Sequence, residues 1–252
     1  MTLIIAHRGA SGYKPEMTIP AYELALQQNA DGFETDVRLT KDLELVGIHD
    51  RKTGRVANSD LVVSKSTLKQ LQELDFSKDQ TTTTSVMTIK EFLTLAIDSG
   101  KSLTLTIETK HITRHHGLLE NKLNDLLTEF RLDKNQHEKV KIVLMSFNPL
   151  AVLRFFRLHP LIPRVQLKEK NYPLLHLYPN SGNPEIVGPG IELLLKKPDL
   201  ITKFKDQGKK VFVWTVNSPQ DMRFCLERGI DAIITNYPDI AYQEREAFLR
   251  SK

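Results

Sequence analysis

The sequence predicts a (β/α)8, or TIM, barrel with a small insertion after its third strand. Three observations favour this fold class. The chain has 252 residues, and such barrels typically have about 250. Short β-rich runs alternate with helical patterns, which is the order of parallel βαβ units. Several of these runs are apolar throughout, as expected for parallel strands buried on both faces. A doubly wound open sheet is the alternative architecture.

Nine segments have the pattern of strands, whereas a barrel of this class has eight. One segment must therefore lie outside the ring, and we expect it to be the short run Glu185–Val187. The nine segments, in order, are Leu3–Ala6, Gly32–Val37, Leu45–His49, Leu103–Glu108, Val140–Ser146, Arg164–Leu167, Glu185–Val187, Val211–Val216 and Ala232–Thr235.

Helical patterns lie between most of these segments. The first places its apolar residues from Ile19 to Leu26 on one face, with Thr18 positioned to cap it and Pro20 tolerated in the first turn. The others are Ile89–Asp98, Leu118–Phe130, Leu150–Arg157, Pro198–Lys205 and Pro219–Glu227.

One segment interrupts this alternation. Between His49 and Ile89 the chain has a capped helical stretch, SKSTLKQLQELDF, and a polar run, Thr81–Ser85, but no clean helix-then-strand unit. We interpret residues 50–87, approximately, as the insertion, with the threonine run as an exposed loop. Because the composition does not shift and no internal repeat occurs, residues 1–252 are expected to form a single domain.

Composition excludes several classes of protein. Thirty-five Lys and Arg against 31 Asp and Glu give a formal charge of +4, too small and too scattered an excess to indicate a nucleic-acid partner. A single cysteine, Cys225, excludes an internal disulfide. The N-terminal residues lack the pattern of a signal peptide, and no apolar run has the length of a membrane span. We therefore expect a cytoplasmic protein without stable membrane insertion. The sequence does not predict an oligomeric state.

Ionisable residues stand at the downstream ends of four early strand segments. Each alone is typical of a solvated turn or a surface ion pair, but chance alone would rarely place them at the same end of four successive segments. Active sites of barrels form at this end of the strands, and side chains two apart on a strand share a face. We therefore expect one common mouth. In chain order the residues are His7 and Arg8, Glu34 and Asp36, His49 and Asp50, and Glu108 and Lys110.

The carboxylates among them suggest a metal site. Glu34, Asp36 and Glu108 offer hard oxygen ligands, which suit one divalent cation, Mg²⁺ or Ca²⁺, rather than zinc. Without such a cation, three neighbouring carboxylates repel one another, and at least one would tend to hold a proton.

The remaining groups suit a phosphodiester. Arg8 can donate to phosphate as a planar fork and Lys110 as a point charge. His7 and His49 can exchange roles as acid and base near neutral pH. Three carboxylates, one divalent cation, one phosphodiester and these two basic side chains would together be neutral.

The motifs HRGASGYKPEMT, FETDV, IHD, IETK, MSF, VWTVN and DAIITNYPD, which run from His7 to about Asp239, resemble those of the glycerophosphodiester phosphodiesterases. Their order is highly specific, although each motif alone is weak. The resemblance implies a TIM barrel with a small insertion after its third strand. It also implies that Glu34, Asp36 and Glu108 hold a divalent metal, that His7 and His49 are catalytic, that Arg8 and Lys110 bind phosphate, and that Trp214 lines the glycerol side of the pocket.

Two positions depart from the family pattern. Met17 stands where the family usually has Asn, and its side chain cannot make the hydrogen bonds of an amide. Asn236 stands where the last strand is usually followed by Asp. Neither departure falls on an implied metal ligand or catalytic histidine.

The resemblance implies metal-dependent hydrolysis of a small glycerophosphodiester to glycerol 3-phosphate and an alcohol such as choline, ethanolamine or glycerol. In the family mechanism one histidine deprotonates the neighbouring glycerol hydroxyl, a cyclic phosphate forms, and the other histidine protonates the leaving alcohol. The sequence does not predict the head group or the choice of metal.

Two alternatives stay open. One is a related enzyme that acts on lysophospholipid or sphingomyelin head groups. It would need an apolar tail groove, for which the stretch Leu174–Tyr178 is the candidate. The other is a barrel that only binds a phosphorylated metabolite, although binding alone does not require two proton carriers.

Overall fold

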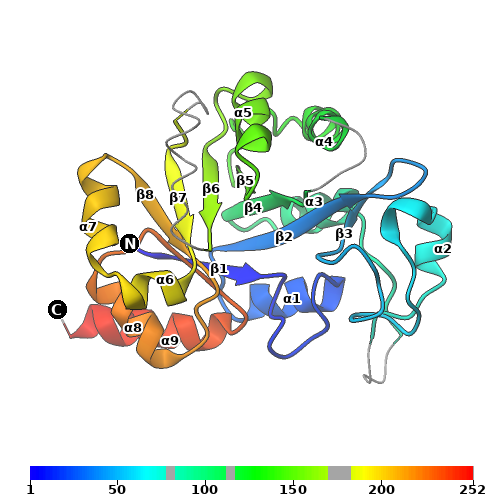
Figure 1. Cartoon of the computed structure of the whole chain (residues 1–252). Coiled ribbons are helices and arrows are strands. Elements are labelled where there is room, and N and C mark those ends of the chain that lie inside the picture. Colours follow the sequence, from blue (N-terminus) through cyan, green and yellow to red (C-terminus); the bar gives the residue numbers. More distant parts are fainter. Residues whose placement is uncertain (78–82, 112–116, 170–182, 252) are drawn as a thin grey trace.

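The protein folds into a closed parallel barrel surrounded by helices (Figure 1). This computed structural model describes residues 1–77, 83–111, 117–169 and 183–251. Among the described residues, eight of the nine strands of the sheet form the ring, which closes because the first strand pairs with both the second and the last. The TIM barrel predicted from the sequence is thus confirmed. The ring comprises β1 (Leu3–His7), β2 (Gly32–Leu39), β4 (Leu103–Thr109), β5 (Val140–Ser146), β6 (Arg164–Lys168), β7 (Ile186–Pro189), β8 (Lys210–Val213) and β9 (Ala232–Thr235).

The prediction that Glu185–Val187 lies outside the barrel is wrong. The strand β7 pairs in parallel with both β6 and β8. The strand outside the ring is β3 (Leu45–Gly47), which pairs antiparallel with β2. The reason is the length of β2, which continues to Leu39, so that the chain turns and runs back along it as a hairpin.

The insertion begins directly after β3, between the second and third strands of the ring. It contains the 3-10 helix η1 (Val63–Lys65) and α2 (Leu68–Gln72), and it lies at the side of the barrel (Figure 1). Buried residues of β3 and of the insertion form a small core of their own. This core comprises Val46, Ile48, Ala57, Val63, Leu71, Phe76 and Val86.

Local signals set several helix boundaries. Capping boxes at Thr67 and Thr88 begin α2 and α3 (Ile89–Asp98), since each threonine side chain accepts from the backbone N–H three residues later. Thr18 occupies the N-cap position of α1 (Ile19–Gln27), but its hydroxyl donates to the Pro15 carbonyl instead of capping the helix. The other helices are α4 (Leu118–Glu129), α5 (Pro149–Leu158), α6 (Ile191–Lys196), α7 (Asp199–Asp206), α8 (Pro219–Glu227) and α9 (Pro238–Arg250).

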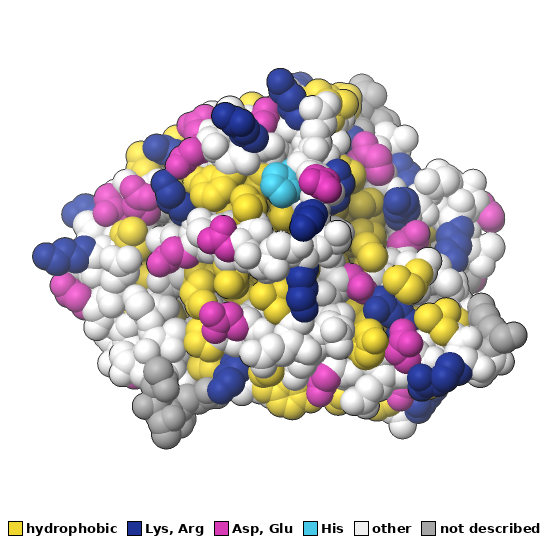
Figure 2. All heavy atoms as spheres, turned by 180° about the vertical axis from the view of Figure 1, so that it is seen from behind, with side chains coloured by type: hydrophobic (Ala, Val, Ile, Leu, Met, Phe, Trp, Pro, Cys, Tyr) yellow, Lys and Arg dark blue, Asp and Glu magenta, His cyan; other side chains and the backbone are white. Residues whose placement is uncertain are grey.

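Side chains fill the barrel interior, so it is a packed core rather than a pore. Ile5, Val165, Ile186 and Phe212 belong to this interior cluster, and two larger clusters pack strands against the outer helices. On the face in Figure 2, acidic and basic side chains are interspersed. Within the described ranges, every helix is too short or too polar to span a membrane. The stretch Leu174–Tyr178, and Thr81 and Thr82 of the threonine run, lie outside the described residues.

Candidate active site at the barrel mouth

Strand register brings the candidate residues together at the carboxyl ends of β1, β2 and β4. His7 of β1 is paired in register with Glu34 of β2, and Asp36 of β2 with Glu108 of β4. Because Glu34 and Asp36 are two residues apart, both side chains lie on the same face of the strand. The parallel ring therefore places these four ionisable side chains around one point.

The three carboxylates form a compact and buried group. Glu34, Asp36 and Glu108 each offer an oxygen, and these oxygens lie within 4.8 Å of one another. Burial, and then the neighbouring charge of Asp36, raise the pKa of Glu34 well above its usual range and that of Glu108 to about 7. Burial would also raise the pKa of Asp36, but Arg8 and Lys110 lower it to about 2.

Two basic side chains are paired with these carboxylates. Arg8 Nε lies 2.9 Å from one oxygen of Asp36 and Lys110 Nζ lies 3.3 Å from the other. Lys110 Nζ also lies 2.8 Å from Glu108. Burial opposes both positive charges, but the carboxylates raise the pKa of each basic group. With all three carboxylates ionised, the two basic side chains would leave the group with one net negative charge.

The turn after β1 aims Arg8 into this group. Arg8 has a φ of 58°, in the left-handed region, and its backbone N–H donates to a Glu34 carboxylate oxygen at 3.2 Å. Met17 also has a positive φ, 53°, and its N–H donates to the Arg8 carbonyl at 2.9 Å. The first loop is thus held through the backbone of Met17, while its side chain is buried.

His7 is the more enclosed of the two histidines. Its Nδ1 lies 2.7 Å from the Asn236 side-chain oxygen, and its Nε2 lies 3.8 Å from Glu34. Ser11 donates to the same Asn236 oxygen at 3.0 Å. Burial, and then the charge of Arg8, lower the pKa of His7 to about 4. The neutral imidazole is therefore the favoured form at neutral pH.

His49 reaches the mouth on the hairpin rather than on a ring strand. It follows β3, whose antiparallel course returns the chain to the site, where the Ile48 N–H donates to the Asp36 carbonyl. Arg38 donates twice to the His49 carbonyl, at 2.9 and 2.7 Å. The His49 Nδ1 lies 2.7 Å from Asp50 Oδ1. Burial is the main cause that lowers the pKa of His49.

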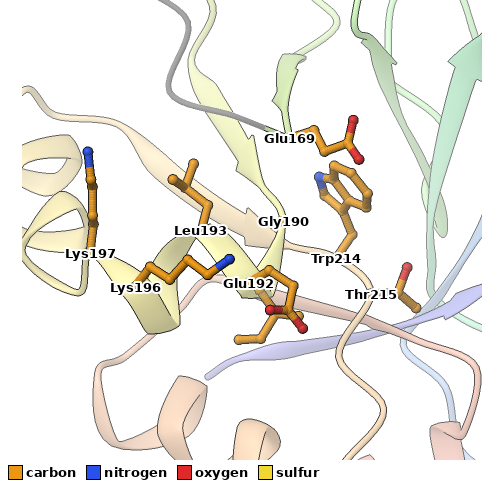
Figure 3. Close-up of a pocket in the computed structure, with 9 residues that line it drawn as sticks. Glu169, Gly190, Glu192, Leu193, Lys196, Lys197, Trp214 and Thr215 are labelled. Carbon is orange, nitrogen blue, oxygen red and sulfur yellow. The ribbon is translucent and has the colours of Figure 1, made fainter.

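Trp214 closes the site on the side of β8. Its indole N–H donates to the Gly188 carbonyl at 2.7 Å, and its ring meets Phe147 edge to face at 5.3 Å. A cavity of 80 Å³ lies among Trp214, Phe147, the two histidines and the charged group. Trp214 and Thr215 also line a neighbouring pocket of 520 Å³, drawn in Figure 3, together with Glu169, Lys196 and others.

The structure thus gathers all eight sequence-predicted site residues at one mouth. Seven line the small cavity, and Asp36 lies in contact with Arg8 and Lys110. No role was predicted from the sequence for Glu16, Arg55 or Phe147. Phe147 directly follows a ring strand, and this position could have indicated that it lies at the mouth. Glu16 and Arg55 are 39 residues apart in the chain, and no periodicity links them.

Comparison with known proteins agrees with this geometry. The model of the glycerophosphoryl diester phosphodiesterase family matches residues 7–240. A Mycobacterium tuberculosis protein named "Probable glycerophosphodiester phosphodiesterase 1" is 36% identical over 244 residues, 93% of this chain and 89% of the relative. The glycerophosphodiester phosphodiesterase of Bacillus subtilis is 30% identical over 98% of this chain and 87% of its own.

Solved structures share the fold. An Oleispira antarctica phosphodiesterase, solved in complex with the product sn-glycerol-3-phosphate, superposes with a TM-score of 0.87 at 22% identity, covering 98% of this chain and 97% of its own. A Parabacteroides distasonis glycerophosphodiester phosphodiesterase gives 0.80 at 25% identity, covering 100% of this chain and 98% of its own.

Proposed function

Since this chain belongs to the glycerophosphoryl diester phosphodiesterase family, and so to the phosphoric diester hydrolases, we propose that it hydrolyses glycerophosphodiesters to glycerol 3-phosphate and an alcohol. The observation that carries this proposal is the single mouth at which three buried carboxylates, two basic side chains and two histidines meet.

A divalent cation fits the carboxylate group. Both oxygens of the buried Asp36 lack a well-formed hydrogen bond to any described residue, although they take part in ion pairs. Lone pairs therefore remain for a cation, and Glu34 and Glu108 complete a set of hard ligands suited to Mg²⁺ or Ca²⁺. Such an ion supplies positive charge that stabilises the anionic phosphoryl oxygens.

Arg8 and Lys110 bind the phosphate in this proposal. With a divalent cation and a singly charged phosphodiester added, the net charge of the group becomes zero. Arg8 contributes an oriented guanidinium, because Asp36 and Glu16 already hold it. Its positive charge stabilises the negative charge that the phosphoryl oxygens carry during the reaction.

The two histidines divide the proton transfers. His49 has a carboxylate partner, Asp50, which favours the protonated ring and suits an acid that protonates the leaving alcohol. His7 has the neutral amide of Asn236 as its partner, which suits a base that deprotonates the glycerol hydroxyl next to the phosphate. That hydroxyl then attacks phosphorus, the alcohol departs, and water opens the resulting cyclic phosphate.

The larger neighbouring pocket accommodates the rest of the substrate. A cavity of 80 Å³ is too small for a whole glycerophosphodiester, whereas the pocket of 520 Å³ lies in the usual range for ligand pockets of about 300–1,000 Å³. Trp214 and Thr215 border both spaces, and Figure 3 shows them at the edge of the larger pocket. The glycerol half must stay in the small cavity, where its hydroxyl can reach His7. We therefore place the alcohol half of the diester beyond Trp214, in the larger pocket.

Turnover of glycerophosphocholine tests the function. The dialysed protein should release glycerol 3-phosphate only after Mg²⁺ or Ca²⁺ is added, and EDTA should abolish release. Asp36→Ala should be inactive and should no longer bind the cation in calorimetry. A substrate without the hydroxyl beside the phosphate should be inert. Full activity in EDTA would contradict the metal assignment, and absence of turnover with every metal would contradict the function.

A further inference from the structure

A continuous series of charged contacts joins the insertion to the histidine of the hairpin. Arg55 of the insertion forms a two-pronged pair with Glu16 of the first loop, with Nη1–Oε2 and Nη2–Oε1 both at 2.7 Å. Its Nε donates to Asp50 Oδ2 at 2.5 Å. The other oxygen of Asp50 lies 2.7 Å from His49 Nδ1. Arg55 therefore uses its three nitrogens to bridge two carboxylates.

We propose that Arg55 is a positioning residue that fixes the orientation and the tautomer of His49 through Asp50. This inference rests on the proposed function, in which His49 transfers a proton. Asp50 accepts from His49 Nδ1–H, so that the other ring nitrogen, Nε2, is the one available for proton transfer. Glu16 anchors Arg55 to the barrel, and Arg55 in turn holds Asp50.

Asp50 needs such support because it is not enclosed. Its side chain is 33% exposed, and an isolated surface ion pair contributes only about 0–1 kcal/mol. Arg55 offers more than a single pair, because a planar guanidinium fixes two carboxylates at once. The backbone of His49 is already held by Arg38, so the remaining freedom lies in the ring and its partner, which is where Arg55 acts.

The contact also gives the insertion a role in catalysis. Among the residues of the insertion that the structure describes, Arg55 contacts both Glu16 and Asp50. Glu16 additionally pairs with Arg8 at 3.1 Å. The insertion thus braces the site from outside the ring, although it contributes none of the carboxylates that are proposed to bind metal.

Replacement of Arg55 tests this role. Arg55→Ala should lower kcat for glycerophosphocholine by about ten- to a hundredfold, the size of effect expected from a misplaced proton carrier, with KM changed less than about threefold. Arg55→Lys should stay close to Arg55→Ala, because one ammonium cannot reproduce the fork. Lys52→Ala is the matched control: it removes a 2.7 Å pair with Asp60 from the same insertion, at an exposed position. Its kcat should equal that of the wild type.

A double substitution separates positioning from a general loss of structure. If Arg55 acts through Asp50, then Asp50→Asn combined with Arg55→Ala should be no more than about threefold slower than Asp50→Asn alone. A double variant whose rate loss equals the product of the two single losses would overturn the proposal. An Arg55→Ala variant with the same kcat as Lys52→Ala would overturn it as well.

A readout independent of turnover keeps the two proposals distinguishable. Nitrogen-15 NMR of the neutral His49 ring should find the proton on Nδ1 in the wild type and a shift toward the Nε2–H form in Arg55→Ala, but not in Lys52→Ala. The same tautomer in all three proteins would overturn the positioning role even if the enzyme is active. The expected shift in a protein without turnover would instead contradict only the proposed function.

Discussion

The two candidate proton carriers have chemically different partners. His49 Nδ1 faces a carboxylate oxygen of Asp50, and His7 Nδ1 faces the amide oxygen of Asn236, each at 2.7 Å. A carboxylate stabilises an imidazolium more strongly than an amide does, because it carries a full negative charge. The substitution of Asn for the usual Asp after the last strand thus makes the two histidines unequal in this protein.

This inequality predicts different responses to the leaving group. His7→Ala and His49→Ala should both abolish turnover of glycerophosphocholine, whose alcohol needs a proton. With a nitrophenyl glycerophosphodiester, whose leaving group departs as an anion, the variant without the acid should recover part of its rate. We expect recovery in His49→Ala only, measured by nitrophenol release. Recovery in His7→Ala alone would reverse the roles, and recovery in neither would assign both rings to positioning.

A second prediction at the residue scale concerns Arg8. Its guanidinium contacts Asp36 through Nε and Glu16 through Nη1, a geometry that a single ammonium cannot reproduce. Arg8→Lys should therefore lower kcat/KM by about a hundredfold, the typical cost of losing one transition-state contact. Steady-state kinetics with glycerophosphocholine measures this loss. Unchanged kinetics would indicate that Arg8 is only a residue of a solvated loop.

At the scale of elements, the sequence predicted which residues meet at the mouth better than it predicted the strand order. The carboxylates follow from a simple rule, because Glu34 and Asp36 must share a face and parallel strands end at the same edge. The direction of Leu45–Gly47 does not follow from its sequence, since a three-residue apolar strand looks the same in either orientation. His49 was therefore placed at the correct mouth by an incorrect route, as the end of a parallel strand.

The strand β7 was predicted as a strand but was wrongly placed outside the ring, because the run Glu185–Val187 is short. Its four residues include Gly188 and Pro189, which are usually unfavourable in strands. Gly188 is nevertheless required there, because a Cβ at this position would lie 2.7 Å from the side chains of Val165 and Leu167. Close packing inside the barrel therefore requires glycine at this position, and no local sequence pattern reveals that packing.

A buried charge links two helices to the segment after β4. Glu120 of α4 is fully buried and lies 3.0 Å from Arg154 of α5 and 3.1 Å from His111. Burial alone would raise the pKa of Glu120, but the close contact with His111 and the hydrogen bond from Arg154 lower it. Because the pKa is lower in the folded protein, this carboxylate stabilises the fold above about pH 4.3, and the contribution is lost as the pH falls further.

We therefore predict that Glu120→Gln lowers the free energy of unfolding by about 2 kcal/mol at pH 7, less than the loss of a fully enclosed partner because Arg154 is partly exposed. The difference from the wild type should shrink as the pH is lowered from about 4.5 to 3. Urea unfolding at each pH measures this difference in the free energy of unfolding. Glu129→Gln, at the end of α4 in an exposed pair with Lys90 of α3, should change stability by less than about 0.5 kcal/mol. Equal effects of the two substitutions would contradict this account.

At the scale of the whole molecule, the two ends of the barrel have different tasks. The end opposite the mouth is held by Arg245 of α9, which pairs with Asp31 and donates to the Thr2 carbonyl at 3.0 Å. Asp31 in turn accepts from the Ile4 N–H at 2.8 Å. This network attaches the last helix to the first and second strands. In barrels of this class, that end serves stability rather than catalysis.

Arg245→Ala should accordingly destabilise the protein without changing its chemistry. Breaking a buried pair costs about 3 kcal/mol, which for a chain of this size is about 6–12 °C in Tm. At 25 °C, kcat and KM for glycerophosphocholine should match the wild type. Arg223→Ala removes an exposed pair between α8 and α9 and should leave Tm nearly unchanged. A loss of kcat in Arg245→Ala that persists at low temperature would contradict this separation.

Closure of the ring between β1 and β9 has a consequence for the order in which activity can arise. Every proposed metal ligand and both histidines lie within the first 108 residues. Yet the partner of His7 follows the last strand, 229 residues away. Contacts between such distant parts of a chain are generally slow to form. During synthesis, the early segments can gather the carboxylates while His7 still lacks its oriented partner, so the last strand to emerge is the one that completes the catalyst.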